Sequence, residues 1–203
     1  MRAISLTQSR VETAAVVFGF SLLMGLLARI AVPLPFTPVP VTGQTLGVLL
    51  AGLVLGAPAA AAAMLLYLAQ GLAGLPVFSP AGPGGAAQLF GPTGGFLLSY
   101  PLAAYLVGWI SRAPRPRSVR VPLALVAGEI AIFTFGALWL GIILGRPAGA
   151  VLSAAVWPFL PGEVLKMALA VTLAAVLRRP ASTDADRSAA DRSADSAAER
   201  HRP

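Results

Sequence analysis

The sequence contains no cysteine, a single histidine and a single lysine, and few of its residues carry a charge. Without cysteine, disulfides and thiol chemistry are excluded. The only histidine is His201, near the end of the chain, so a histidine metal site or a Ser-His-Asp triad in the core is also excluded. The sequence has no Walker-type phosphate-binding motif. Any nucleotide hydrolysis that this protein uses must therefore come from another chain.

The low share of charged residues indicates a membrane protein. Charged residues make up 11% of the 203 residues and hydrophobic residues 57%, whereas roughly 25% of an ordinary soluble domain is charged. Apolar runs of about 20 residues indicate membrane-spanning helices, since lipid cannot satisfy an open backbone. The net charge of +7 is not arranged as a nucleic-acid-binding stripe, because most cations outside the C-terminal tail lie in short connections between apolar runs. We therefore predict an integral membrane protein with no nucleic-acid partner.

Apolar segments divided by Pro/Gly-rich or Arg-rich connections predict an all-α fold of six transmembrane helices. We place these helices near residues 11–32, 46–55, 59–73, 94–111 and 121–144, and from Pro161 to the arginine pair at 178–179. The connection at 112–120, RAPRPRSVR, contains four arginines. The loops that join helices 1 and 2, 3 and 4, and 5 and 6 together contain a single Lys or Arg residue, Arg146. By the positive-inside rule, both termini are then cytoplasmic and these three loops face outward.

Two of the outward loops have unusual compositions. Residues 33–40 contain four prolines, which exclude a regular helix there. Residues 74–94 form a long Gly/Pro-rich loop that also carries Phe78, Gln88 and Phe90. Loops of this length are usually functional or disordered, and we expect this one to be structured with its aromatic residues buried. Residues 1–180 are then one domain, and the polar, low-complexity residues 181–203 form a disordered cytoplasmic tail.

Glu163 and Lys166 stand in the last apolar segment, one helical turn apart and on the same helix face. A charged side chain at membrane depth costs about 2.5–3.5 kcal/mol on insertion scales and therefore usually faces a partner or a cavity. The two residues could form a closed ion pair without a ligand, or the polar floor of an outward cavity. Glu129, in the fifth segment, could pair with an arginine of the 112–120 connection, and we favour this structural role over a role in transport chemistry.

Other candidate ligand contacts lie where predicted helices begin or break. Thr42 and Gln44 precede the second helix, where a threonine can cap the helix and an amide can offer donors and acceptors to a polar ligand. Phe78, Gln88 and Trp157 lie in irregular segments. Ala15 and Gly19 form a small-xxx-small pair, which lets another helix approach closely.

Four stretches together resemble a known family: PVPVTGQTLGVLLAGLVLG, LYLAQGLAGLPVF, GPTGGFLLSYP and PFLPGEVLKMALA. They are similar to BioY, the biotin-specific substrate-binding (S) component of energy-coupling-factor (ECF) transporters, and the resemblance covers about residues 11–178. It implies six helices, cytoplasmic termini in the inner membrane, no cofactor, and a biotin site beneath loops 1–2 and 3–4. It also implies an acid and a lysine near the vitamin, which correspond to Glu163 and Lys166; many members have aspartate at the first position.

The resemblance further implies partners. Transmembrane and ATPase subunits would energise transport, and the family docks its transmembrane partner on a small-residue face of helix 1, here Ala15 and Gly19. A homo-oligomer is left open.

Three alternatives to biotin uptake remain: an S component for another vitamin, an intramembrane enzyme with Glu163 as general base and Lys166 as its second group, and a structural membrane protein. The residues do not decide which end of biotin Glu163 and Lys166 would meet.

Overall fold

The computed structural model describes residues 10–178, so the predicted tail at 181–203 lies outside the described residues. The described part holds eight helices and one two-stranded sheet. The long helices are α1 (Arg10–Ala28), α2 (Gln44–Leu55), α3 (Ala57–Leu72), α5 (Gly94–Ile110), α6 (Arg117–Leu144) and α8 (Leu160–Leu177). The short elements are β1 (Ala31–Leu34), β2 (Thr37–Thr42), α4 (Gly85–Leu89) and α7 (Ala148–Ala155).

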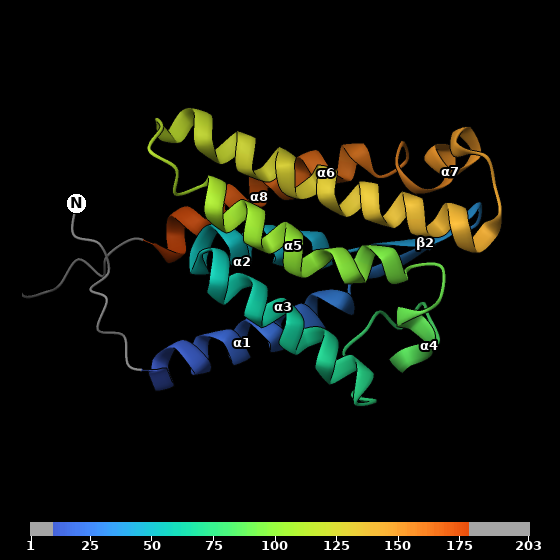
Figure 1. The fold of residues 1–203 in the computed structure, drawn as a ribbon, viewed down its shortest axis with the longest axis horizontal. Helices are drawn as coiled ribbons and strands as arrows, with labels where there is room; N and C mark the ends of the chain where they lie inside the picture. Colours follow the sequence, from blue (N-terminus) through green and yellow to red (C-terminus); the bar gives the residue numbers. More distant parts are fainter. Residues whose placement is uncertain (1–9, 179–203) are drawn as a thin grey trace, which may run out of the picture.

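The long helices form a bundle whose irregular elements gather at one end. The β-hairpin, α4 and α7 lie at one end of the long axis, and the α5–α6 connection and the end of α8 lie at the other (Figure 1). Helix α5 packs against α6, α3 and α2, while α2 also packs against α8, and α1 packs against α3. Helix α2 therefore holds α8 against the rest of the bundle.

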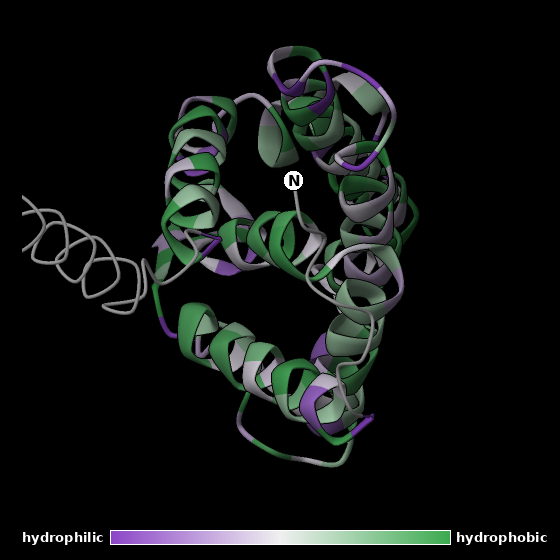
Figure 2. Ribbon diagram, turned by 90° about the vertical axis from the view of Figure 1, so that its left-hand side faces the viewer, coloured by the Kyte–Doolittle hydropathy of each residue, from purple (hydrophilic) through white to green (hydrophobic). Residues whose placement is uncertain are grey.

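The long helices match the predicted apolar segments. Helices α1, α6 and α8 are each long and apolar enough to cross a membrane, whereas α2, α3 and α5 are apolar but shorter. Figure 2 shows hydrophobic residues along most of the helical ribbon. Large apolar side chains such as Phe18, Leu26, Ile130, Leu138 and Val164 are exposed on the outer faces of these helices. Such apolar faces suit contact with lipid rather than with water. That all six long helices cross the membrane stays a prediction.

Small residues allow the helices to approach closely. A methyl group added at Gly95 of α5 would lie 2.2 Å from Cβ of Trp139 in α6. A methyl group added at Gly108 would lie 2.3 Å from the backbone nitrogen of Ala57. Gly56 joins α2 to α3 with φ of 90°, a value that glycine adopts without strain. The closest helix contacts of the bundle thus depend on glycine.

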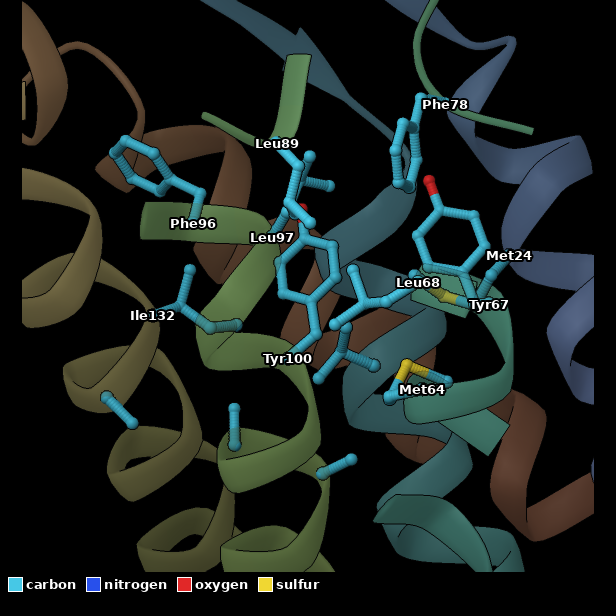
Figure 3. Close-up of a cluster of buried hydrophobic side chains, with 14 of the residues drawn as sticks. Met24, Met64, Tyr67, Leu68, Phe78, Leu89, Phe96, Leu97, Tyr100 and Ile132 are labelled. Carbon is cyan, nitrogen blue, oxygen red and sulfur yellow. The ribbon is translucent and has the colours of Figure 1, made fainter. Parts of the chain in front are cut away.

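The core is built around aromatic side chains from α3, α5 and the 73–84 segment. Tyr67 and Phe78 meet edge to face with ring centroids 5.4 Å apart (Figure 3). Met24, Met64 and Leu68 lie around Tyr67, whereas Phe96 of α5 and Ile132 of α6 lie on the α6 side of α5 (Figure 3). Leu97 and Tyr100 also come from α5, and Tyr100 points toward Leu68 (Figure 3). The cavity described below is also lined by Phe96, Leu97, Tyr100 and Ile132.

Several sequence predictions are wrong in detail. Helix α1 ends at Ala28 rather than near residue 32, because the following residues enter an antiparallel hairpin that pairs Ala31 with Thr42 and Val32 with Val41. The hairpin, α4 and α7 are additional to the predicted helices. Phe90 is 64% exposed rather than buried.

Helix α6 begins at Arg117, inside the connection predicted at 112–120. Pro116 immediately precedes it with extended ψ of 140°. Proline suits a helix start, where a missing N–H costs nothing. The arginine-rich connection is therefore shorter than predicted.

Candidate ligand-binding site

A cavity opens at the end of the bundle that carries the hairpin, α4 and α7. It contains about 540 Å³ of space between atoms, including the part that is open to solvent. The residues that line it come from β2, the 73–93 segment and helices α2, α5, α6, α7 and α8. They are Val39, Pro40, Thr42, Gln44, Thr45, Ser79, Gln88, Thr93, Phe96, Leu97, Tyr100, Ile132, Phe133, Ala155, Phe159, Glu163 and Lys166.

Three polar side chains form a closed cluster at one wall of the cavity. Lys166 Nζ donates to Glu163 Oε1 at 2.7 Å and to Thr45 Oγ1 at 3.0 Å. Thr45 Oγ1 in turn donates to Glu163 Oε2 at 2.7 Å. Glu163 lies in the first turn of α8, where the positive end of the helix dipole stabilises an anion. The ion pair is thus satisfied within the protein and also lines the cavity.

A second polar chain connects α2 to α3 and to the 73–84 segment. Gln44, in the first turn of α2, donates from Nε2 to the hydroxyl of Tyr67 at 2.6 Å, and that hydroxyl donates to the carbonyl of Val77 at 3.2 Å. Thr42 Oγ1 accepts from the backbone N–H of Gln44 at 3.4 Å, although the N-cap residue of α2 is Gly43. Gln44 is therefore held in one orientation, and its side-chain oxygen has no hydrogen-bond partner among the described residues.

The segment between α3 and α5 covers one side of the cavity. Gln88, in α4, accepts at Oε1 from the backbone N–H of Gly84 at 3.1 Å. Arg29, just after α1, donates to the carbonyl of Pro76. These contacts hold the segment against the bundle, and Ser79 and Gln88 from it reach the cavity.

Aromatic side chains form much of the apolar lining of the cavity. Phe96 and Tyr100 are spaced four residues apart on α5 and so share a face. Phe96 meets Phe133 of α6 edge to face, with centroids 6.4 Å apart, and Phe159 comes from the start of α8. None of these four residues was singled out as a ligand contact from the sequence. The sequence feature that could have indicated two of them is the i, i+4 spacing of Phe96 and Tyr100 directly after the Gly94-Gly95 pair.

The structure brings most of the predicted contact residues together, with two exceptions. Thr42, Gln44, Gln88, Glu163 and Lys166 all line the cavity. Phe78 instead packs in the core against Tyr67 and close to Gly71. Trp157 is 60% exposed and does not line the cavity.

Two predictions outside the cavity have different outcomes. Ala15 and Gly19 lie exposed on α1, and no atom comes within 4 Å of a methyl group added at Gly19. The predicted pairing of Glu129 with an arginine is wrong, because its buried carboxyl group lies beside that of Glu163 and forms no ion pair with an arginine among the described residues. The reason is geometric: Glu129 lies three turns into α6, beside α8 rather than beside the arginine-rich end.

The arrangement suits recognition of a small molecule that is part polar and part apolar. A carboxylate, an ammonium group, two amides and several hydroxyl groups line the same cavity as four aromatic side chains. No group of three or more His, Cys, Asp or Glu side chains within residues 10–178 could hold a metal ion. Fold and cavity together indicate a helical membrane protein with a candidate small-molecule site at one end of its bundle.

Comparison with known proteins identifies the family. The sequence profile of the BioY family matches residues 2–183, and the chain belongs to this family. "Biotin transporter BioY" of Rhizobium etli is 38% identical over 160 residues, covering 74% of this chain and 82% of that one. "Biotin transporter BioY" of Rhodobacter capsulatus is 40% identical over 167 residues, covering 71% and 85%.

A solved structure has the same fold. The crystal structure of the S-component for biotin from an ECF-type ABC transporter superposes with a TM-score of 0.78 at 27% sequence identity. The match covers 88% of this chain and 96% of that one. The fold is thus the mostly helical fold of an ECF S component, and the protein is a membrane protein.

Proposed function

We propose that this protein binds biotin with high affinity and takes it up across the cytoplasmic membrane as the S component of an ECF-type transporter. The observation that carries the proposal is the cavity that the Thr45–Glu163–Lys166 cluster lines together with aromatic side chains of α5 and α6. Membership of the BioY family and the likeness to an S component for biotin support the same ligand.

Biotin has chemistry that fits this cavity. Its ureido group offers two N–H donors and one C=O acceptor, its bicyclic ring is apolar, and its side chain ends in a carboxylate. The oxygens of Glu163 and Gln44 can accept N–H groups, and the ammonium group of Lys166 can donate to a carbonyl or a carboxylate. Phe96, Tyr100 and Phe159 supply an apolar surface for the ring.

The proposed topology has six membrane-spanning helices, cytoplasmic termini and a cavity that faces outward. Arg112, Arg115, Arg117 and Arg120 lie in or beside the connection at the end of the bundle away from the hairpin (Figure 1). Cytoplasmic loops carry an excess of Lys and Arg. This charge asymmetry supports an orientation in which the hairpin and the 73–93 segment cover the cavity from the outside.

Transport in this proposal requires partner subunits. Since the sequence has no Walker-type motif, ATP hydrolysis is assigned to an ECF ATPase, which acts through a transmembrane subunit. We assign docking of that subunit to the exposed α1 face that contains Ala15 and Gly19, because small residues permit close helix approach. The named relatives are transporters rather than enzymes, so the proposal contains no catalytic role for Glu163 or Lys166.

Uptake of labelled biotin by cells tests this function. A bacterial strain without biotin transport of its own would express the chain together with ECF transmembrane and ATPase subunits. We expect saturable accumulation that exceeds that of the same strain with the partner subunits alone. Accumulation at the level of that control, with the chain present in the membrane, would contradict the proposal. Accumulation of riboflavin or thiamine instead would indicate an S component for another vitamin.

A further inference from the structure

Arginines from three parts of the chain gather at the end of the bundle away from the ligand cavity (Figure 1). Arg112 follows α5, and Arg178 follows α8. Arg117 and Arg120 lie one turn apart at the start of α6. These four residues are called the arginine cluster below. An apolar cluster holds the same helix ends together, and it includes Leu53 of α2, Val107 of α5, Leu125 of α6 and Ala174 of α8.

The positive charge of the arginine cluster has no ion-pair partner within residues 10–178. None of its four members forms a salt bridge with a carboxylate of that part of the chain. Partial burial, and then the positive charges of Arg112, Arg117 and Arg120, lower the pKa of Arg178. The guanidinium groups therefore repel one another, and an anion that binds among them would relieve this repulsion.

Backbone carbonyls hold two members of the cluster in place. Arg120 donates from Nη1 to the carbonyl of Ala113 at 3.1 Å, and its Nε is buried without a hydrogen-bond partner among the described residues. Arg112 donates to carbonyls near the ends of α2 and α5, which are those of Gly52, Val54 and Gly108. These contacts fix two guanidinium groups but supply no negative charge.

The other two members have all their side-chain donors available. Arg117 and Arg178 are exposed, and the side chain of neither donates a hydrogen bond to another residue within 10–178. A guanidinium group has five N–H donors in a planar fork that matches two oxygens of a phosphate. Arg117 also lies in the first turn of α6, where the helix dipole attracts anions. The cluster thus presents the chemistry that binds a phosphate group.

Exposed apolar side chains continue from the cluster along the outer faces of two helices. Val119 and Leu123 of α6 are exposed, as are Val176 and Leu177 of α8. A free phosphate ion makes no use of such a surface, whereas the acyl chains of a phospholipid can cover it. The combination of cations and apolar surface therefore favours a lipid over a free anion.

We propose that the arginine cluster binds the phosphate group of an anionic phospholipid, whose acyl chains lie along the outer faces of α6 and α8. Basic pockets between transmembrane helices bind anionic headgroups in this way. The positive-inside rule places arginines on one side of the membrane, but it does not require that arginines from three helix ends gather at one place. This site is independent of the identity of the ligand in the cavity.

Binding of fluorescently labelled phosphatidylglycerol to the purified chain in detergent micelles tests this site. The loss of one arginine beside a lipid phosphate predicts about fivefold weaker binding. We expect this loss for Arg117→Gln and for Arg178→Gln, and about 30-fold weaker binding for the double variant. Unlabelled phosphatidylglycerol should displace the label, whereas phosphatidylcholine, which has no net charge, should not.

Arg115→Gln is the matched control. It removes the same charge from the same connection, but Arg115 is not among the charges that act on Arg178. Its affinity for phosphatidylglycerol should fall by less than about twofold. Unfolding temperatures without lipid show that each variant is folded, and those of Arg117→Gln and Arg178→Gln should equal or exceed that of the wild type, because each change reduces the repulsion.

Four results would overturn the proposal: no saturable binding of the labelled lipid by the wild type, wild-type lipid affinity in the double variant, equal weakening by Arg115→Gln, or equal displacement by phosphatidylcholine. Displacement by inorganic phosphate at concentrations as low as those of the lipid, with ionic strength matched by chloride, would instead assign the cluster to a free phosphate. If the double variant loses co-purification with ECF subunits while its lipid binding is unchanged, the cluster belongs to a protein interface.

Discussion

The ammonium group of Lys166 already forms hydrogen bonds within the protein, and it can form a further one to a ligand. Its ammonium group has three N–H donors, and two of them are directed to Glu163 and Thr45. The carboxylate of Glu163 can accept about four hydrogen bonds and accepts one at each oxygen from these neighbours. The cluster can therefore keep its geometry and still bind a polar group from the cavity.

Replacement of Glu163 and Lys166 separates ligand binding from structural support. A hydrogen bond to a charged group contributes roughly 1.5–3 kcal/mol, so Glu163→Ala and Lys166→Ala should each weaken biotin binding by about 10- to 150-fold. Each single change also leaves the other charge without its partner, which lowers stability with or without ligand. Affinity in the double variant is therefore the decisive quantity, with unfolding followed separately.

The double variant should bind biotin at least as weakly as the weaker single variant. Removal of both charges cancels the penalty of a stranded charge but not the loss of a ligand contact. Recovery of near-normal affinity in the double variant would mean that the pair only supports α8.

Sequence patterns predicted the polar lining of the cavity better than its aromatic lining. Glu163 and Lys166 were evident because charges inside an apolar run require a reason, and Gln44 because it stands at a helix start. The aromatic residues could not be assigned in the same way. An irregular segment does not reveal which way its side chains point, so Phe78 was assigned to the ligand although it packs in the core. Glu129 was assigned to arginines that the fold holds elsewhere.

Among the secondary-structure elements, the long helices were predicted from the sequence and the β-hairpin was not. Hydrophobic length predicted each long helix, with ends that differ by a few residues. The hairpin was not predicted, because prolines argue against a strand. Pro33 and Pro38 nevertheless lie inside β1 and β2. A two-stranded sheet has only edge strands, and proline is tolerated where its missing N–H faces away from the partner strand.

The close contact of α5 with α6 makes Gly95 sensitive to substitution. A methyl group there would meet the backbone oxygen of Phe135 at 2.6 Å as well as Trp139. Overpacking of this kind typically costs about 1–3 kcal/mol, so Gly95→Ala should lower the unfolding temperature of the detergent-purified protein. Gly141→Ala in α6 is the matched control, because its nearest contact would be Val151 at 3.5 Å. Equal unfolding temperatures for both variants would show that α5 and α6 can separate freely.

The α1 face with Ala15 should affect assembly rather than ligand binding. Ala15→Trp adds bulk to an exposed surface far from the residues that line the cavity. If a transmembrane partner packs there, a clash of about 1–3 kcal/mol should weaken assembly by about 5- to 150-fold. Co-purification with the partner subunit measures this effect, with biotin affinity determined on the same variant.

Val16→Trp is the control for added bulk, since it points about 100° away around the helix. The docking assignment fails if Ala15→Trp co-purifies normally with the partner, and more so if biotin binding drops instead.

At the scale of the whole molecule, polarity is divided between the two ends of the bundle. Arginines concentrate at the end with the α5–α6 connection. The cavity lies at the other end, together with the Thr45–Glu163–Lys166 cluster, in which the two opposite charges cancel. Between these two ends, apolar side chains cover the outer faces of α1, α6 and α8. This distribution suits a protein that is fixed in one orientation in a membrane and takes its ligand from one side.

Equilibrium binding of labelled biotin to the detergent-purified chain tests the central claim most directly, because it requires neither partner subunits nor a membrane. The account predicts saturable binding at a single site, displacement by unlabelled biotin, and no displacement by a large excess of riboflavin or thiamine. Absence of saturable binding by folded protein, or equal displacement by riboflavin or thiamine, would contradict the account.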